Sequence, residues 1–386
     1  MLQTLAIENY RSLRDLALPL GRLNLVTGAN GSGKSNLYRA LQLLARTARG
    51  GLIAALASEG GLQSCFWAGP EQHSRGMRDG TVPIQGGPRR EPVRLRLGFA
   101  GEDFSYAIAL GLPKPSISMF ALDPEIKHEA IWAGPLYRPA SSLVEREGPQ
   151  ARTREGRGWQ RLGGSLPAQD SLFEHLAGAD TLPEVAQLRE QIRQWRFYDH
   201  FRSDAQAPAR QPQLGTQTPR LGHDGADLAA ALQTIREIGD GDALDEAIED
   251  AFPGARLQIC SSDDTRFSLQ LHQHGLLRPL SGAELSDGTL RYLLWMAALL
   301  SPRPPPLMVL NEPETSLHPD LLPALGRLIR RAARDTQVWV VSHATRLIAA
   351  LEADPDCQLL TLDKQLGRTQ LADHDELDLP GWRWPD

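Results

Sequence analysis

The sequence is short of cysteine and of lysine. Its 386 residues include three cysteines, Cys65, Cys260 and Cys357, which lie far apart. Because their number is odd and no two are close, they indicate neither a disulfide framework nor a zinc site, and we expect three reduced thiols. Lysine occupies only four of the 41 Lys and Arg positions, namely 34, 114, 127 and 364. Arginine suits phosphate contacts, but its abundance by itself predicts none.

The sequence also lacks long apolar runs and a basic net charge. No stretch approaches the roughly 18 uninterrupted apolar residues of a membrane span. The first ten residues, M-L-Q-T-L-A-I-E-N-Y, have neither the basic nor the long apolar segment of a secretory signal. The net charge of −6 argues against a globally basic nucleic-acid binder. With 41% hydrophobic and 23% charged residues, the composition is that of an ordinary globular protein, which we expect in the cytoplasm without a membrane partner.

A glycine-rich motif between an expected strand at 22–27 and an expected helix at 34–46 is the strongest feature of the chain. Residues 28–35 read G-A-N-G-S-G-K-S, the spacing of a phosphate-binding loop. Glycines let consecutive N–H groups face one phosphate, and the helix N-terminus adds partial positive charge. We expect Lys34 to reach the β- and γ-phosphates and Ser35 to bind Mg²⁺. The alternative is a glycine turn before an ordinary helix.

A second group of polar residues follows two apolar strands near the end of the chain. The run L-M-V-L at 307–310 predicts a strand buried on both faces, and Asn311 and Glu312 follow it. A carboxylate at the end of such a strand, downstream of a phosphate loop, can orient a water for attack on a phosphate. His343 follows the expected strand at 337–341, so it should lie near the same sheet edge. The alternative is a structural histidine, which is the commoner role at a strand end.

The rest of the chain predicts a mixture of strands and helices. Alternating apolar residues predict an antiparallel pair at 92–99 and 104–111, outside the parallel sheet of the phosphate loop. Residues 134–170 have little apolar periodicity and predict a mobile insertion with little regular structure. We expect further strands at 2–8 and 13–20, and helices at 183–201, 226–238, 242–252, 289–300, 320–333 and 345–352. Strands alternate with helices after residue 300, which predicts a mainly parallel α/β sheet.

Six motifs, in this order, resemble those of one family. They are I-E-N-Y-R-S-L at 7–13, G-A-N-G-S-G-K-S-N at 28–36, L-S-D-G-T-L-R at 285–291, L-N-E-P-E at 310–314, S-L-H-P at 316–319 and V-S-H at 341–343. Together they resemble the ABC-type ATPases of the SMC and RecF class, particularly the stand-alone AAA-family ATPases grouped with RecF-like and OLD-like proteins. The resemblance is specific at both ends of the chain and loose between residues 50 and 220.

The resemblance implies an α/β fold of the ABC-ATPase head type, with a mainly parallel P-loop sheet, an antiparallel β lobe and a helical lobe. It implies that residues 1–386 form a single head. Residues 1–50 and 281–386 would form the P-loop core. The antiparallel β lobe would then be 51–133, and the helical or insertion lobe 134–280.

The resemblance also implies roles for individual residues. It assigns Walker A to 28–35, Walker B to 307–312 and the D-loop to 315–318. Glu312 would be the catalytic base, with Lys34 and the switch histidine His343 completing the catalytic group. ATP would be bound by a larger set, formed by Arg11, Asn30, Gly31, Ser32, Gly33, Lys34, Ser35 and Asn36 of one copy and by Ser286 and Gly288 of a second copy. Mg²⁺ would be bound by Ser35 and Asn311.

The chain departs from the family in three places. The Walker B aspartate position is Asn311, whose amide can accept a hydrogen bond from a Mg²⁺-bound water but lacks the charge that holds the ion. The Q-loop glutamine is not identified, and the candidates are Gln63, Gln72 and Gln85. The chain has no long heptad segment and only a short stretch after His343, so we expect neither a true SMC protein nor a nuclease fused in cis.

The sequence supports two main hypotheses of function. The first is an ATPase that forms a homodimer on ATP binding and acts in DNA repair, DNA maintenance or anti-phage defence. DNA would contact arginines of the insertion at 134–161, where residues 138–161 hold six arginines and three glutamates, or the arginines of helix 320–334, namely Arg327, Arg330, Arg331 and Arg334. A solvated loop is the alternative for 138–161. The second hypothesis, motivated by Asn311, is a slow nucleotide-dependent switch that regulates a separate effector protein. A transporter subunit and a small-molecule kinase are weaker readings, since a kinase leaves 285–291 without a role.

Overall fold

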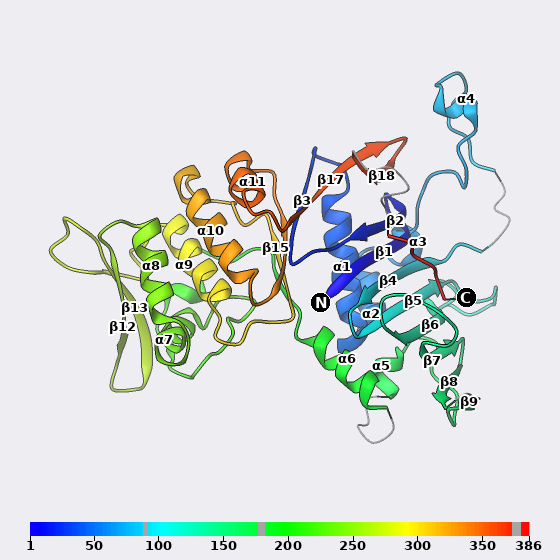
Figure 1. Ribbon diagram of the computed structural model, residues 1–386, viewed down its shortest axis with the longest axis horizontal. Coiled ribbons are helices and arrows are strands. Elements are labelled where there is room, and N and C mark those ends of the chain that lie inside the picture. The colour runs from blue at the N-terminus through cyan, green and yellow to red at the C-terminus, as the bar shows by residue number, and fades with distance from the viewer. Residues whose placement is uncertain (88–91, 157, 177–181, 373–379, 386) are drawn as a thin grey trace. The chain divides into compact units, whose positions relative to one another are not determined.

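The computed structural model describes residues 1–87, 92–156, 158–176, 182–372 and 380–385. The chain divides into two compact units, each assembled from separate stretches of sequence (Figure 1). The first unit comprises Met1–Gly21, Thr27–Gln194 and Leu360–Asp386, and the second comprises Arg22–Val26 and Trp195–Leu359. None of the helices in the described ranges combines the length and the apolar character needed to cross a membrane.

The first unit is built on an antiparallel sheet of eight strands, the largest sheet of the described chain. Its order is β2-β1-β4-β5-β6-β7-β8-β9, and all neighbours are antiparallel. The strands are β1 (Leu2–Tyr10), β2 (Leu13–Pro19), β4 (Leu95–Gly101), β5 (Phe104–Gly111), β6 (Glu125–Ala133), β7 (Ser142–Glu147), β8 (Gln150–Glu155) and β9 (Gly158–Arg161). The strand pair predicted at 92–99 and 104–111 is confirmed as β4 and β5, although β4 starts only at Leu95.

Strands β7, β8 and β9 correct the expectation of a mobile insertion over 134–170. They extend the antiparallel sheet to its edge. Their polar composition hid the strand pattern, because an antiparallel sheet can leave one face in water and then needs few apolar residues. Here Val144 and Ala151 are buried, whereas Arg152 is exposed.

The longest helix of the first unit is α1 (Lys34–Arg49), which follows the phosphate loop. Its apolar residues recur every three or four positions, and Leu37, Leu41 and Leu44 are buried. The helix packs against β1, β4 and three shorter helices. The shorter helices of this unit are α2 (Leu52–Ser58), α3 (Leu62–Cys65), α4 (Arg75–Arg78), α5 (Leu172–His175) and α6 (Pro183–Arg193). Strand β17 (Cys357–Gln365) enters the unit at Leu360 and pairs with β18 (Arg368–Leu371).

The second unit contains four parallel strands in the order β10-β15-β16-β3. They are β10 (Arg196–Tyr198), β15 (Leu307–Asn311), β16 (Gln337–Val341) and β3 (Leu23–Gly28), of which 23–26 belong to this unit. Strand β16 is buried along its whole length and β15 as far as Leu310, as expected for strands covered on both faces. The carboxyl ends of parallel strands meet at one edge, and Asn311 and Ser342 lie there.

Helices and a small sheet form the rest of the second unit. The helices are α7 (Leu228–Ile238), α8 (Gly241–Ala251), α9 (Asp287–Leu299), α10 (Leu322–Ala332) and α11 (Thr345–Glu352), with short 3₁₀ turns η1 (Pro208–Arg210) and η2 (Pro319–Leu321). The small sheet contains β11 (Gln213–Leu214), β12 (Arg256–Ser261), β13 (Arg266–His272) and β14 (Leu280–Ser281). Helix α9 packs against α7 and α10 and is buried on nearly all sides, which explains its almost wholly apolar sequence.

The α/β class predicted from the sequence is confirmed, and the fold contains several sheets. The helix predicted at 183–201 is wrong beyond its first part. Helix α6 ends at Arg193, and Arg196–Tyr198 forms β10 beside β15. The apolar residues of this segment continue the helical spacing, but Phe197 and Tyr198 also favour a strand, and pairing with β15 decides the outcome.

Candidate functional site

Three glycines with positive φ shape the phosphate loop in the first unit. The φ values are 140° at Gly28, 80° at Gly31 and 113° at Gly33. A Cβ on Gly33 would lie 2.2 Å from Thr369 Oγ1, so the position requires glycine. The same Thr369 hydroxyl donates to Ser32 O at 2.7 Å and supports the loop from β18. The loop therefore owes its shape to backbone conformation and to one neighbouring side chain.

Lys34 is the first residue of α1 and is buried inside the loop. Its Nζ donates to Gly28 O at 2.6 Å and to Ala29 O at 3.1 Å. The hydroxyl of Ser32 is buried and has no hydrogen-bond partner among the residues described here, whereas Ser35 is exposed. The loop thus combines the Lys34 ammonium, the Ser32 hydroxyl and the N-terminus of α1, which are features that bind an anion.

Two further residues of the predicted nucleotide set lie at the start of the same unit. Asn36 Nδ2 donates to Ser12 Oγ at 2.9 Å and ties α1 to the turn after β1. Arg11 Nη2 forms an ion pair with Glu59 at 2.9 Å, and Tyr10 Oη donates to the same carboxylate at 2.6 Å. The charge of Arg11 is therefore partly offset by Glu59.

In the second unit, an amide and two carboxylates gather at the end of β15. Asn311 Nδ2 donates to Asp199 Oδ1 at 2.5 Å. Asp199 follows β10, and the parallel register of β10 with β15 brings the two strand ends together. The next residue, Glu312, has a φ of 48°, and its N–H donates to Val341 O at 2.8 Å. The Glu312 side chain is 45% exposed, so it is open to a substrate.

His343 lies beside two glutamates, Glu312 at the end of the Walker B segment and Glu314 just after it. Its Nδ1 is 3.3 Å from Glu314 Oε1 and 3.9 Å from Glu312 Oε1. Glu314 is buried, and its Oε1 accepts from Ser342 Oγ at 2.8 Å, His343 N at 2.9 Å and Ala344 N at 3.2 Å. Glu314 therefore fixes the backbone that carries His343. The structure brings together Glu312 and His343, which the sequence analysis predicted as neighbours.

The L-S-D-G motif begins helix α9. Ser286 is the N-cap of α9, and its exposed side chain accepts from Thr289 N at 3.1 Å. A Cβ on Gly288 would lie 3.1 Å from Ser316 O, so glycine permits the close approach of α9 to the D-loop. Asp287 forms an ion pair with Arg210 at 2.7 Å. This turn and the edge of β15 both belong to the second unit.

No sequence motif singles out Asp199 or Arg210. Asp199 lies at the end of the helix predicted at 183–201, and Arg210 lies between that helix and the one predicted at 226–238, where no element was predicted. The pair Phe197-Tyr198 before Asp199 was the available signal, since two aromatic residues after a helix end favour a strand. The Q-loop candidates Gln63, Gln72 and Gln85 are exposed, and Gln63 lies on α3.

The arginines proposed for DNA contacts differ in their surroundings. On α10, Arg327 pairs with Asp250, Arg330 with Asp354, and Arg331 with both Asp240 and Glu246. In the first unit, Arg146 is fully buried and lies 3.8 Å from Glu129. Arg152 and Arg154 stack on Trp159. Arg157 lies outside the described residues.

Comparison with known proteins gives a family match over most of the chain. Residues 23–349 match the family described as "AAA domain, putative AbiEii toxin, Type IV TA system". A stretch of 44 residues is 46% identical to an OLD nuclease from Thermus scotoductus, and it spans 11% of this chain and only 8% of the nuclease.

Two structures of SMC heads are among the solved structures that are similar to this chain. The SMC head bound to the C-winged helix domain of ScpA has a TM-score of 0.50 and 11% identity, over 96% of this chain and 97% of that one. The SMC head domain from Thermotoga maritima has a TM-score of 0.45 and 15% identity, over 97% and 99% of the two chains.

Proposed function

The chain belongs to this AAA-domain family and is an ABC/SMC-like ATPase of the OLD/RecF type, and on that premise we propose that two copies bind ATP head to tail and separate after hydrolysis. The phosphate loop of one copy binds the nucleotide, and Ser286 and Gly288 of the other copy contact its γ-phosphate. The observation that carries the proposal is the presence of two separate glycine turns, each at the start of a helix with an exposed serine, Ser35 and Ser286. Each turn is suited to an anion.

The residues present fit ATP and Mg²⁺. The unused Ser32 hydroxyl, the centred Lys34 ammonium and the loop N–H groups suit phosphate oxygens. Ser35 and Asn311 would hold Mg²⁺, and the Asp199 carboxylate beside Asn311 supplies the negative charge that the amide lacks. Mg²⁺, when bound, neutralises phosphate charge.

The groups at the end of β15 suit the hydrolytic step. Glu312 is the general base in this proposal, because its carboxylate is exposed and can accept a proton from a water. His343 follows the neighbouring strand β16, and in this proposal it contacts either the γ-phosphate or the attacking water. Glu314 keeps His343 in place through the backbone N–H groups after β16.

The assembly test uses Glu312→Gln, which removes the base and should trap the ATP-bound state. With ATP, this variant should shift from monomer to dimer in light scattering, and Ser286→Arg should prevent the shift. A Glu312→Gln protein that stays monomeric in saturating ATP would refute the head-to-tail mechanism.

A slow nucleotide-dependent switch that acts on an effector protein is the second candidate function. The observation that favours it is the neutral amide at Asn311, where the family carries a carboxylate. Steady-state hydrolysis distinguishes the two: turnover that Glu312→Gln abolishes supports the ATPase, and tight ATP binding without turnover supports the switch.

DNA is the proposed partner, in repair, maintenance or anti-phage defence, and the nuclease among the relatives supports that setting. The edge of the antiparallel sheet is the surface proposed for DNA. Like the arginines of α10, Arg152 there pairs with a carboxylate, that of Glu145, whereas Arg94 and Arg161 add further positive charge. A pocket of about 320 Å³ there is lined by the cations Arg94, Lys127, Arg152 and Arg161, and also by the acids Glu145 and Glu147. We expect DNA binding in ATP to weaken as salt rises. An affinity that is the same at low and moderate salt would count against it.

A further inference from the structure

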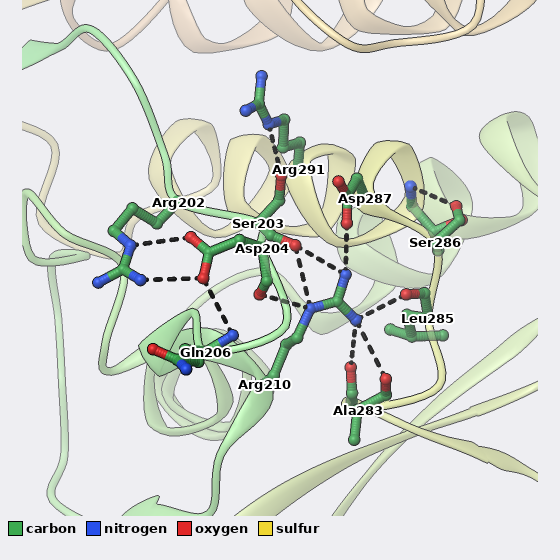
Figure 2. Close-up of polar contacts among 12 residues, drawn as sticks. Arg202, Ser203, Asp204, Gln206, Arg210, Ala283, Leu285, Ser286, Asp287 and Arg291 are labelled. Atoms are coloured by element: carbon green, nitrogen blue, oxygen red, sulfur yellow. Dashed lines mark hydrogen bonds and ion pairs between the residues drawn. The ribbon is translucent and has the colours of Figure 1, made fainter.

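One buried arginine holds the turn that leads into α9 from the inside, as Figure 2 shows. Arg210 ends the short turn η1 and is 8% exposed. Its Nη1 donates to three carbonyls of the turn, Gly282 O at 3.1 Å, Ala283 O at 3.3 Å and Leu285 O at 2.6 Å. Its Nη2 donates to Asp287 Oδ1 at 2.7 Å. One guanidinium therefore contacts both sides of Ser286.

The other side of the same guanidinium is anchored in the segment after β10. Arg210 Nε donates to Ser203 O and Asp204 O at 3.1 Å, and Nη2 donates to Ser203 O at 2.8 Å. Arg291 of α9 reaches the same segment through Ser203 Oγ at 3.0 Å, and it also donates to Thr315 O at 3.0 Å. Two arginines thus connect the start of α9 to residues 203–204, and one of them also reaches the D-loop.

The contact with Asp287 has an electrostatic consequence. Asp287 is in the first turn of α9, where a carboxylate interacts favourably with the helix dipole but repels an incoming phosphate. Arg210 is the cation that offsets this carboxylate. The guanidinium is nearly buried, while the Asp287 side chain is 61% exposed, so this partly buried pair is screened less by salt than a fully exposed one. Without Arg210, the turn would lose its internal support and gain uncompensated negative charge.

We propose that Arg210 is a positioning residue for the turn at 282–287 before α9, here called the signature turn. It fixes the direction of Ser286 and neutralises Asp287, so that the turn can receive the γ-phosphate held by a second copy. The inference rests on the proposed function, since it presupposes that Ser286 acts on a partner's nucleotide. Arg210 itself touches no nucleotide in this scheme. Its loss should therefore weaken assembly on ATP and leave the binding of ATP to the phosphate loop unchanged.

The test is made in the full-length Glu312→Gln protein with ATP and Mg²⁺. Arg210→Met should require at least tenfold more protein to form the ATP-dependent dimer, measured by light scattering across a dilution series. Arg210→Lys keeps the charge, loses most of the carbonyl contacts and should give a smaller loss. The affinity of the monomer for a fluorescent ATP analogue should stay within twofold in both variants.

Arg278→Met is the matched control. Arg278 pairs with Glu284 in the same turn, and this exposed pair does not involve residues 285–287. The control should dimerise like the parent. The inference is overturned if Arg210→Met or the milder Arg210→Lys dimerises at the parent's concentration, or if ATP binding falls together with dimerisation. A Glu312→Gln parent that never dimerises overturns the proposed function, and the inference with it.

Discussion

The phosphate loop and the signature turn both lead into a helix through glycine, yet they are held in opposite ways. The phosphate loop takes its shape from positive φ angles, its helix has no side-chain cap, and its cation, Lys34, is the helix's own first residue. The signature turn is capped by Ser286, carries an acid in the first turn of its helix, and receives its cation from Arg210, far away in sequence.

The difference shows what each turn can do alone. Around Lys34 the helix N-terminus is uncapped by side chains and its first turn carries no acid, so the loop is ready for a phosphate without help. At Ser286 the capping bond and Asp287 already use much of the positive end of α9. We therefore expect the first turn to bind ATP by itself, and the second to contribute only when a nucleotide is presented to it.

Gly33→Ala is the substitution expected to disturb the phosphate loop most, because this loop takes its shape from its own backbone conformation. A Cβ there would lie 2.2 Å from Thr369 Oγ1 at a φ of 113°, which should disrupt the bond that Thr369 makes to Ser32. Strain and overpacking together should cost about 2–4 kcal/mol of unfolding free energy. The control is Gly31→Ala, where φ is 80° and, among the described residues, no heavy atom other than those of its chain neighbours lies within 4 Å of the added Cβ. It should cost about 1 kcal/mol. Urea unfolding measures both, and equal costs would contradict the clash.

Removing the cation of the loop should have the next largest effect. Lys34→Ala deletes the ammonium that bonds Gly28 O and Ala29 O, and ATP affinity should fall by about 100-fold, as expected for losing a charged hydrogen bond. Titration with a fluorescent ATP analogue measures the change. Arg39→Ala removes an exposed cation from the same helix and should have little effect. If Lys34→Ala binds the ATP analogue with unchanged affinity, this loop is not the nucleotide-binding site.

The parts of the fold that the sequence predicted are those with local signals. The glycine motif, the apolar run at 307–310 and the capped start of α9 each reveal their structure within about ten residues. Strand β10 was missed because its residues continue the spacing of α6, while its partner β15 is distant in sequence. Strands β7 to β9 were missed because they are polar and lie at a sheet edge.

The same distinction applies to the site. Lys34, Glu312 and His343 could be named because each directly follows a recognisable loop or strand. Asp199 and Arg210 could not, since their importance lies in contacts with Asn311 and Asp287 that only the folded chain creates. Positions whose partners are remote carry no local pattern, and the carboxylate that bonds the Asn311 amide comes from the segment after a neighbouring strand, β10.

Exchanging the carboxylate and the amide between positions 199 and 311 tests whether Asp199 supplies the negative charge that Asn311 lacks. Asp199→Asn should raise the Mg²⁺ concentration needed for half-maximal thermal stabilisation by ATP by about tenfold, because a carboxylate holds the ion better than an amide. Asn311→Asp should lower stability without Mg²⁺, since it places two carboxylates where a 2.5 Å hydrogen bond now lies. The double variant keeps one carboxylate and should restore most of the Mg²⁺ response.

The control for this exchange is Asp204→Asn. Asp204 lies on the same segment, but its carboxylate pairs with Arg202 and is not part of the Asn311 contact. Its Mg²⁺ requirement should match that of the unaltered protein. If Asp199→Asn behaves in the same way as this control, Asp199 does not supply the missing charge.

The smallest expected effect concerns the outer side of the signature turn. The Arg278 guanidinium and Ser281 lower the pKa of Glu284 to about 2. A carboxyl whose pKa is lowered by folding stabilises the protein fully above its ordinary pKa and loses that contribution as the pH falls toward the folded value. Glu284→Gln should therefore be slightly less stable than the unaltered protein at pH 7, with the difference shrinking below about pH 4.5.

Urea midpoints at pH 7, 5 and 3 measure this difference. Because Arg278 and Glu284 are exposed, solvent screens the pair, and its effect should be far smaller than that of Arg210→Met on dimerisation. A large loss of stability in Glu284→Gln at pH 7 would mean that the turn is held from its outer face as well. The contrast between a turn shaped by its own glycines and a turn clamped by one buried arginine would then no longer hold.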